Sequence, residues 1–280
     1  MYEMVQKESV DCLLGVPTVW LGLLQYLEGK NLKLDTVDQV LVGGSAAPYS
    51  MIKAFDEQHD AFLTHGWGMT EMSPLGSYNK PMEWMKDATD EEKDAYRVRA
   101  GRLVYGVEMK IVDSDKNELP WDGIASGLLV VRGPWVCNGY FRLDDQPAFD
   151  DDGWFDTGDM ASIDEYGYVV ITDRVKDVIK SGGEWISSID VENAAMAHDE
   201  VQEAAVIGVP HPKWTERPLL IVVPPEGKTP DKNDIIKSLE GKIAKWWIPE
   251  YCVFVEEIPH TATGKISKKD LRERFKEYEY

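Results

Sequence analysis

The chain has 280 residues, 43% of them hydrophobic and 10% aromatic, which is enough apolar material for one large domain or two modest ones. Thirty lysines and arginines against fifty aspartates and glutamates give a formal charge of −20, which repels polyanions and argues against nucleic acid as the main partner. The three cysteines, Cys12, Cys137 and Cys252, form no CxxC pair, which excludes a disulfide framework and a zinc knuckle, and we expect reduced, buried thiols.

The first 80 residues alternate between helix, strand and turn signals. Residues 18–27 place apolar side chains on one helical face, and residues 49–58 have the same spacing. Between them, residues 39–42 predict a short buried strand that ends at the turn GGSAAP. Residues 61–64 predict a second strand that runs into HGWGMTEMSP. This succession predicts an α/β layer.

Two stretches of different character follow. Residues 81–99 are charged and helix-forming with few apolar anchors, so we expect an exposed, peripheral helical excursion. Residues 101–170 predict a small β-rich subdomain, because short alternating runs at 108–112, 128–132 and 168–172 are separated by Gly, Pro and Asp clusters.

The last third of the chain predicts a separate α+β domain. The expected elements are a helix capped near Ser188, strands at 204–209, 219–223 and 253–255, a helix over 231–245 and a basic terminal helix.

Five segments contain residue types suited to chemistry. They are GGSAAP (43–48), GWGMTE (66–71), DDGWFDTGD (151–159), DRVKDVIKSGGEWIS (173–187) and PHTATGKIS (259–267). Taken singly, each has a structural explanation as a tight glycine turn, a core tryptophan, a solvated aspartate or a surface charge. The same residue types also suit a nucleotide, because glycine turns let backbone amides approach an anion and carboxylates bind Mg²⁺ or a diol.

Together and in this order, GWGMTE, GWFDTGD, DRVKDVIKSGGEWIS and TGKIS resemble the C-terminal portion of adenylate-forming enzymes of the acyl-CoA synthetase branch. The resemblance covers nearly the whole chain and is weakest over 81–99. It implies part of a large AMP-binding domain over 1–172, a hinge at 173–176 and a small, mobile α+β domain over 177–280. It also implies two steps, in which a carboxylate and ATP give an acyl-adenylate and CoA then displaces AMP.

The resemblance implies a role for each matching residue of the large domain. The adenine and acyl pocket would be lined by Gly43, Gly44, Ser45 and Ala46. Trp67 and Gly68 would wall that pocket, and Asp159 would hold the ribose. Thr70 and Glu71 would meet phosphate and Mg²⁺, with Glu71 as the metal ligand.

In the small domain the resemblance implies a second set of roles. Arg174 would also hold the ribose, and Lys176 would be the hinge about which the domain rotates between the two steps. Gly182 and Gly183 would border the pantetheine tunnel, where a residue without Cβ leaves room. Lys265 would stabilise charge on the carboxylate and α-phosphate during adenylation.

One family feature is missing from the sequence. Adenylate-forming enzymes carry a Ser/Thr/Gly-rich phosphate loop ending in Pro-Lys-Gly upstream of the GGSAAP turn, and no such segment occurs here. We therefore expect either a piece of a longer enzyme or a natural truncation, with impaired activity alone.

The resemblance predicts an AMP-forming acyl-CoA ligase that uses ATP, Mg²⁺ and coenzyme A. The segments SGGEWIS and WWIPEY resemble those of acyl-chain ligases more than those of aryl ligases, which favours a medium- or long-chain fatty or related aliphatic acid as substrate. Two alternatives stay open: an amino-acid adenylation domain that loads a carrier protein, and a non-catalytic remnant. The polar opening MYEMVQKESVD and the lack of an apolar run of roughly 18 residues predict a cytoplasmic protein without an integral membrane segment.

Overall fold

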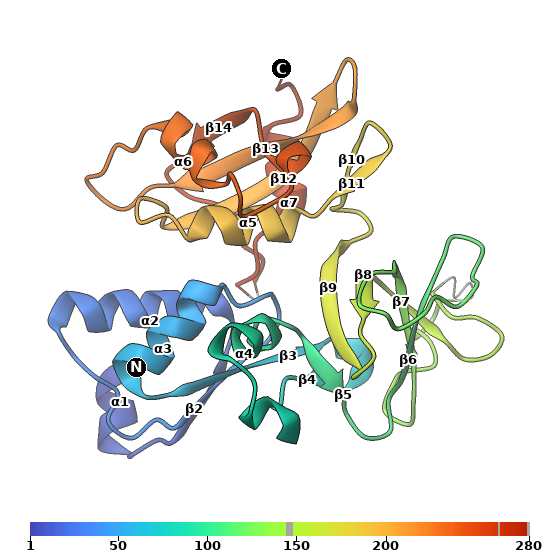
Figure 1. Ribbon diagram of the computed structural model, residues 1–280, viewed down its shortest axis with the longest axis horizontal. Coiled ribbons are helices and arrows are strands. Elements are labelled where there is room, and N and C mark those ends of the chain that lie inside the picture. The colour runs from blue at the N-terminus through green and yellow to red at the C-terminus, as the bar shows by residue number, and fades with distance from the viewer. Residues whose placement is uncertain (144–147, 263, 279–280) are drawn as a thin grey trace. The chain divides into compact units, whose positions relative to one another are not determined.

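A computed structural model describes residues 1–143, 148–262 and 264–278, in two compact units that we call unit 1 (Met1–Thr172) and unit 2 (Asp173–Tyr280) (Figure 1). The elements of unit 1 are α1 (Tyr2–Lys7), β1 (Cys12–Gly15), α2 (Pro17–Lys30), β2 (Gln39–Val42), α3 (Tyr49–His59), β3 (Phe62–Gly68), η1 (Thr70–Met72), β4 (Leu75–Tyr78), η2 (Glu83–Lys86), α4 (Asp90–Arg97), β5 (Gly101–Leu103), β6 (Glu108–Val112), β7 (Ser126–Arg132), β8 (Phe155–Ile163) and β9 (Tyr168–Arg174).

Unit 1 is built on one mixed sheet whose strand order is β1-β2-β3-β4-β5-β9-β8-β7-β6. Strands β1, β2 and β3 pair in parallel, as expected where helices connect them. The pairs β3–β4, β4–β5, β5–β9, β6–β7 and β7–β8 are antiparallel. Helices α2 and α3 pack on the parallel strands through a core that includes Trp20, Phe55 and Leu63. The predicted α/β layer is confirmed.

The antiparallel strands β6, β7 and β8 form the β-rich part of unit 1. Their inward side chains alternate along each strand, with Ile111, Leu129 and Phe155 in one buried cluster. This agrees with the alternating pattern expected over 101–170.

The excursion over residues 81–99 folds as η2 and α4 and is better anchored than expected. Met85 is buried, and the Arg97 guanidinium pairs with Asp56 of α3. The Asn79 side-chain amide donates to the carbonyl oxygens of Tyr96 and Arg99, both at 2.7 Å. A Thr89–Glu92 capping box begins α4. The helical structure of this segment was predicted correctly. Its contacts with the rest of unit 1 were not, because each depends on a single residue and leaves no periodic pattern in the sequence.

The elements of unit 2 are β10 (Ile179–Ser181), β11 (Glu184–Ile186), α5 (Ser188–Met196), β12 (Glu203–His211), β13 (Thr215–Val223), α6 (Lys232–Ser238), η3 (Lys245–Trp247), β14 (Tyr251–Phe254) and α7 (Lys268–Arg274). Alternate residues of β12 face opposite sides of the sheet. Val206 packs with α5 and α6, whereas Ile207 packs with Leu271 of α7. Helices therefore cover both faces, which is the predicted α+β arrangement.

Two expectations need correction. The helix expected over 231–245 ends at Ser238, because the chain turns at Gly241, where φ is +77°. Cys12 is exposed rather than buried, because it lies on the outward-facing side of the edge strand β1. Among the described residues, no helix has the length and apolar character needed to cross a bilayer.

Candidate functional site

The predicted glycine turn follows β2 directly. Gly43 donates its N–H to the Gly15 carbonyl oxygen at 3.1 Å, which continues the strand register by one residue. Gly44 has φ of +90°, a backbone conformation that residues with a side chain rarely adopt, so this turn requires glycine there. Gly44 and Ser45 are exposed and Ala46 is half-buried. The turn therefore offers accessible backbone at the carboxyl end of a parallel strand, where α/β folds bind ligands.

Two other predicted residues meet although 92 positions separate them. The Trp67 indole Nε1–H, at the end of β3, donates to Asp159 Oδ2 of β8 at 2.9 Å. Asp159 is only 2% exposed, and its own N–H donates to Thr157 Oγ1 at 3.1 Å. The two motifs GWGMTE and DTGD are thus joined at one place in unit 1.

Glu71 and Thr70 lie just beyond, on the short helix η1. Glu71 Oε1 accepts a hydrogen bond from the Tyr140 hydroxyl at 2.8 Å, and the Glu71 carbonyl oxygen accepts from the Cys137 N–H at 2.7 Å. Burial of its hydroxyl and the bond to Glu71 raise the pKa of Tyr140 to about 12. Thr70 is exposed. Tyr140 was not predicted from the sequence, where its only signal is a glycine-tyrosine pair in a loop.

His65 is a buried neighbour of the glycine turn that the sequence analysis also missed. It pairs with Val42 in the parallel β2–β3 register, so it stands beside the start of the turn. Burial lowers the pKa of its imidazole, and its Nδ1 has no hydrogen-bond partner within the described parts of the chain. Hydrogen bonds with the backbone of Arg99, Ser45 and Val98 act on this pKa in the opposite direction, so the ring also contacts the glycine turn at Ser45.

Unit 2 begins at a buried carboxylate beside the predicted ribose and hinge residues. Asp173 is 1% exposed and accepts hydrogen bonds from the Ser188 N–H and hydroxyl at 2.7 and 2.5 Å. Arg174 is half-buried and Lys176 is exposed, within a turn closed by the Asp177 N–H and the Arg174 carbonyl oxygen at 2.8 Å.

Gly182 and Gly183 form the hairpin turn between β10 and β11. Their φ values are +60° and +90°. A Cβ on Gly182 would stand 2.9 Å from Trp214 Cε3, whereas a Cβ on Gly183 would meet nothing within 4 Å. Trp214 packs edge-on against Trp246 at 4.9 Å between ring centroids. This aromatic wall was not predicted, because Trp214 and Trp246 lie in separate loops of the sequence.

Lys265 lies on a tight loop, of which residue 263 is outside the described residues. Its N–H donates to Thr261 Oγ1 at 3.2 Å, and its carbonyl oxygen accepts from the Thr261 N–H at 2.7 Å. Ser267 then caps α7. The Lys265 side chain is thus carried by a closed loop that directly precedes helix α7.

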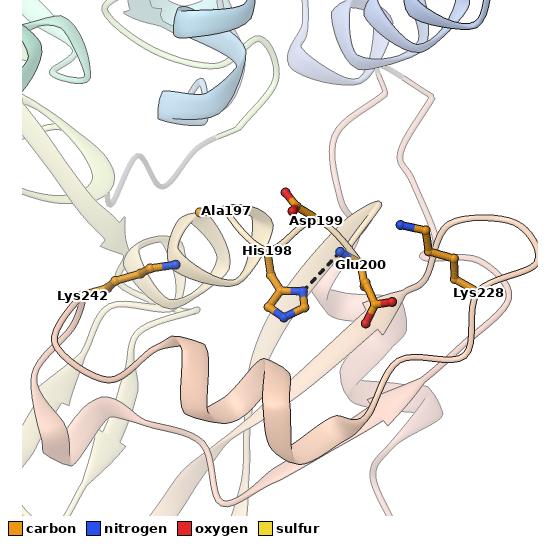
Figure 2. Close-up of a pocket in the computed structure, with 6 residues that line it drawn as sticks. All are labelled: Ala197, His198, Asp199, Glu200, Lys228 and Lys242. Carbon is orange, nitrogen blue, oxygen red and sulfur yellow. Dashed lines mark hydrogen bonds between the residues drawn. The ribbon is translucent and has the colours of Figure 1, made fainter.

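Unit 2 also has a hollow of about 490 Å³ that none of the predicted residues lines. In Figure 2 its lining residues surround a turn in which the Glu200 N–H donates to His198 Nδ1 at 3.2 Å. In Figure 2, Lys242 and Lys228 lie on opposite sides of the turn that carries Asp199 and Glu200, so charges of both signs line the hollow. This mixture favours no one class of ligand.

Two family models match separate stretches of the chain. The AMP-binding enzyme family model matches residues 1–141, and the AMP-binding enzyme C-terminal domain model matches residues 190–265. The 3-methylmercaptopropionyl-CoA ligase of Ruegeria pomeroyi is 50% identical over 98% of this chain and 51% of that protein. The medium-chain-fatty-acid–CoA ligase of Ectopseudomonas oleovorans is 45% identical over 98% of this chain and 50% of that protein.

Solved structures are similar to this chain as well. An anthranilate CoA ligase in complex with anthranoyl-AMP superposes with a TM-score of 0.85 at 26% identity, covering 96% of this chain and 51% of that one. ATP-bound MatB from Rhodopseudomonas palustris gives 0.82 at 29% identity, covering 99% and 53%. The chain spans about half the length of the curated relatives it matches. It belongs to the AMP-binding enzyme family.

Proposed function

We propose that this chain works in an AMP-forming acyl-CoA ligase, which joins a carboxylic acid to coenzyme A at the expense of ATP. In the first step a carboxylate oxygen attacks the α-phosphorus of ATP and pyrophosphate leaves. In the second step the CoA sulfur attacks the acyl carbonyl carbon and AMP leaves.

The contact between Trp67 and Asp159 carries this proposal. It brings an aromatic ring and a buried carboxylate together at 2.9 Å from two distant motifs. An aromatic face suits a purine base, and a carboxylate suits a vicinal diol. With the glycine turn after β2 as a further part of the base pocket, unit 1 thus offers groups for the base and the ribose of a nucleoside monophosphate.

The other residues take the parts that the family resemblance implies. Thr70 would donate to a phosphate oxygen, Arg174 would contribute to ribose binding, and Lys265 would stabilise negative charge in the first step. Lys176 would be the hinge of unit 2 between the steps, and the turn at Gly182 and Gly183 would border the pantetheine path.

The donor set of this site fits Mg²⁺ better than a transition metal. The described residues contain no group of three or more His, Cys, Asp or Glu side chains placed to hold a metal. Mg²⁺ commonly binds through one or two carboxylates and the phosphates of a substrate, so Glu71 alone suffices as a protein ligand. Tyr140, which donates to Glu71 Oε1, would orient that carboxylate. When bound, Mg²⁺ neutralises charge on the phosphates.

An aliphatic acid is the proposed substrate class. The 50% identical relative is named for 3-methylmercaptopropionate, and relatives at 45% and 44% identity are named for medium-chain and long-chain fatty acids. Relatives named for aromatic acids stand lower, at 34% for cinnamate and 31% for indoleacetate. The range from a short thioether acid to a fatty acid extends the chain lengths expected from the sequence.

The test measures each half-reaction separately. The chain is mixed with CoA and a preformed acyl-adenylate of 3-methylmercaptopropionate or octanoate, and acyl-CoA is measured by mass spectrometry. The same acids are then supplied with ATP, Mg²⁺ and CoA. We expect protein-dependent acyl-CoA from the adenylates, and no loss of this activity in Lys265→Ala.

The open alternatives give different results in the same experiment. An amino-acid adenylation domain would transfer its acyl group to carrier-protein phosphopantetheine and not to CoA. A non-catalytic remnant would give no thioester from the adenylate, and failure to bind AMP as well would contradict the proposed function.

A further inference from the structure

The ring of Trp67 is held in place from several sides. A Cβ on Gly76 would stand 2.6 Å from Trp67 Cζ3, so the indole lies directly against a glycine backbone. A Cβ on Gly68 would stand 1.9 Å from the Pro74 carbonyl oxygen, so the chain that leaves Trp67 is equally confined. The direction of the indole N–H is therefore determined by close packing.

The backbone that carries Asp159 is held just as firmly. The Asp159 N–H donates to Thr157 Oγ1 at 3.1 Å, and the Thr157 hydroxyl donates to the Leu129 carbonyl oxygen at 2.7 Å. A carboxylate nevertheless turns easily about χ2, because that torsion has a broad profile. The hydrogen bond from Trp67 to Oδ2 therefore helps to set the direction in which the two oxygens point.

The orientation of this carboxylate matters for a ribose but not for a base. Both hydroxyls of a vicinal diol can donate to one carboxylate only when its plane faces them. Asp159 is 2% exposed, so turning its carboxylate away from the indole N–H would take one donor from a buried charge.

We infer that Trp67 is a positioning residue for Asp159, whose indole N–H orients the carboxylate so that the site prefers ribonucleotides to deoxyribonucleotides. This inference rests on the proposed function, since it assumes that Asp159 faces the ribose. It assigns Trp67 a second task besides walling the base pocket. The two tasks are separable, because only the second depends on the N–H.

The test compares the affinities of the 280-residue chain for AMP, 2′-deoxy-AMP and 3′-deoxy-AMP by isothermal titration calorimetry. Trp67→Phe removes the N–H and part of the ring, so it weakens stacking equally for all three ligands. The ratio of deoxy-AMP to AMP dissociation constants cancels that loss. We expect this ratio to fall by about three- to tenfold in Trp67→Phe, the range expected for one hydrogen bond.

Two further variants make the result specific. Benzothienylalanine at position 67 keeps the shape of indole but has no N–H, so it should lower the ratio even if Trp67→Phe folds poorly. Trp84→Phe is the matched control, because Trp84 lies in the same unit and its buried Nε1 has no partner within the described residues. The ratio should not change in this control.

Three outcomes would overturn the inference. If the variants at position 67 weaken AMP and its deoxy analogues by the same factor, Trp67 is only a wall, and the proposed function stands. If Trp84→Phe lowers the ratio equally, the effect is not specific to the bond with Asp159. If the wild-type chain binds no AMP, this inference and the proposed function both fail.

Discussion

The three cysteines differ in their exposure to solvent. Cys12 is exposed on β1, Cys137 is half-buried, and burial raises the pKa of the Cys252 thiol to about 11. Since only the thiolate reacts, roughly one Cys252 in a thousand is reactive at pH 8. We predict that iodoacetamide at pH 8 modifies Cys12 first and Cys252 only after unfolding, as measured by peptide mass spectrometry. Equal labelling of Cys12 and Cys252 in the folded chain would contradict this.

Gly183 and Gly22 isolate the effect of backbone conformation, because an added Cβ would meet nothing within 4 Å at either position. Gly183 has φ of +90°, whereas Gly22 lies inside helix α2. We predict that Gly183→Ala lowers the free energy of unfolding by about 1–3 kcal/mol through backbone strain. Gly22→Ala should raise it by about 0.5–1 kcal/mol through helix propensity. Urea denaturation monitored by circular dichroism measures both.

The same contrast limits what a bulky substitution can say about the pantetheine path. Because φ at Gly183 is +90°, Gly183→Leu should melt early whether or not CoA passes nearby. A CoA-specific effect at this turn has to be measured against Gly183→Ala, which has the same strain without the bulk.

At the scale of elements, a buried ion pair ties α7 to α5 and β12. Lys268, the first residue of α7, pairs with Glu192 of α5 at 2.8 Å, with side-chain exposures of 11% and 12%. Its Nζ also contacts the Ser188 hydroxyl, which donates to Asp173. Glu192 Oε1 accepts the Val206 N–H of β12 at 2.8 Å. Burial raises the pKa of Glu192, while the carboxylates of Glu192 and Asp173 raise the pKa of Lys268 despite its burial.

We predict that Lys268→Met destabilises the chain by about 3–5 kcal/mol, because it leaves Glu192 buried without a cation. The double variant Lys268→Met/Glu192→Leu should recover part of this loss, since the unpaired Glu192 charge is then gone, while Asp173 still lacks Lys268 and the Val206 N–H lacks its acceptor. Urea denaturation of the two single variants and the double variant gives the coupling between the residues. Additive losses would mean that the two side chains contribute independently.

Elements were predictable from sequence where local signals agreed with the final packing. Strand β2 has the predicted bounds, because an apolar run ends at a glycine turn that the fold also uses. The helix predicted over 231–245 was too long, because Ile235, Leu239 and Ile243 keep helical spacing although the chain leaves the helix after Ser238. All three contribute to the same core, so burial alone does not distinguish a helix from the irregular segment after it.

The site was predictable in its residue types and not in its contacts. Trp67 and Asp159 were each identified from their motifs, but they form their hydrogen bond although β4, β5 and β9 separate β3 from β8 in the sheet order. Tyr140 lies 69 residues from Glu71 and was missed for the same reason. Contacts of this kind come from topology, which residue spacing does not encode. The proposed roles of Lys265, Arg174 and Lys176 stay predictions.

At the scale of the whole molecule, the chain carries both halves of the proposed chemistry but no phosphate loop. Thr70 and Glu71 are the residues of unit 1 proposed for the phosphates, and the family's Ser/Thr/Gly-rich loop is absent from the sequence. Positioning and charge stabilisation supply most of the catalysis of reactions at phosphorus. We therefore expect the second half-reaction to be less impaired in this chain than the first.

Adenylation is expected to differ between the chain alone and a chimera with the upstream half of the Ruegeria pomeroyi relative, which is 50% identical over the shared part. The chain alone should show little ATP–pyrophosphate exchange. The chimera should exchange at least about 100-fold faster, since losing even one preorganised donor to a developing charge commonly costs that much. Lys265→Ala in the chimera should abolish exchange yet spare thioester formation from a supplied acyl-adenylate. Fast exchange by the chain alone would show that phosphate positioning resides within these 280 residues, and equal loss of both half-reactions would make Lys265 a structural residue.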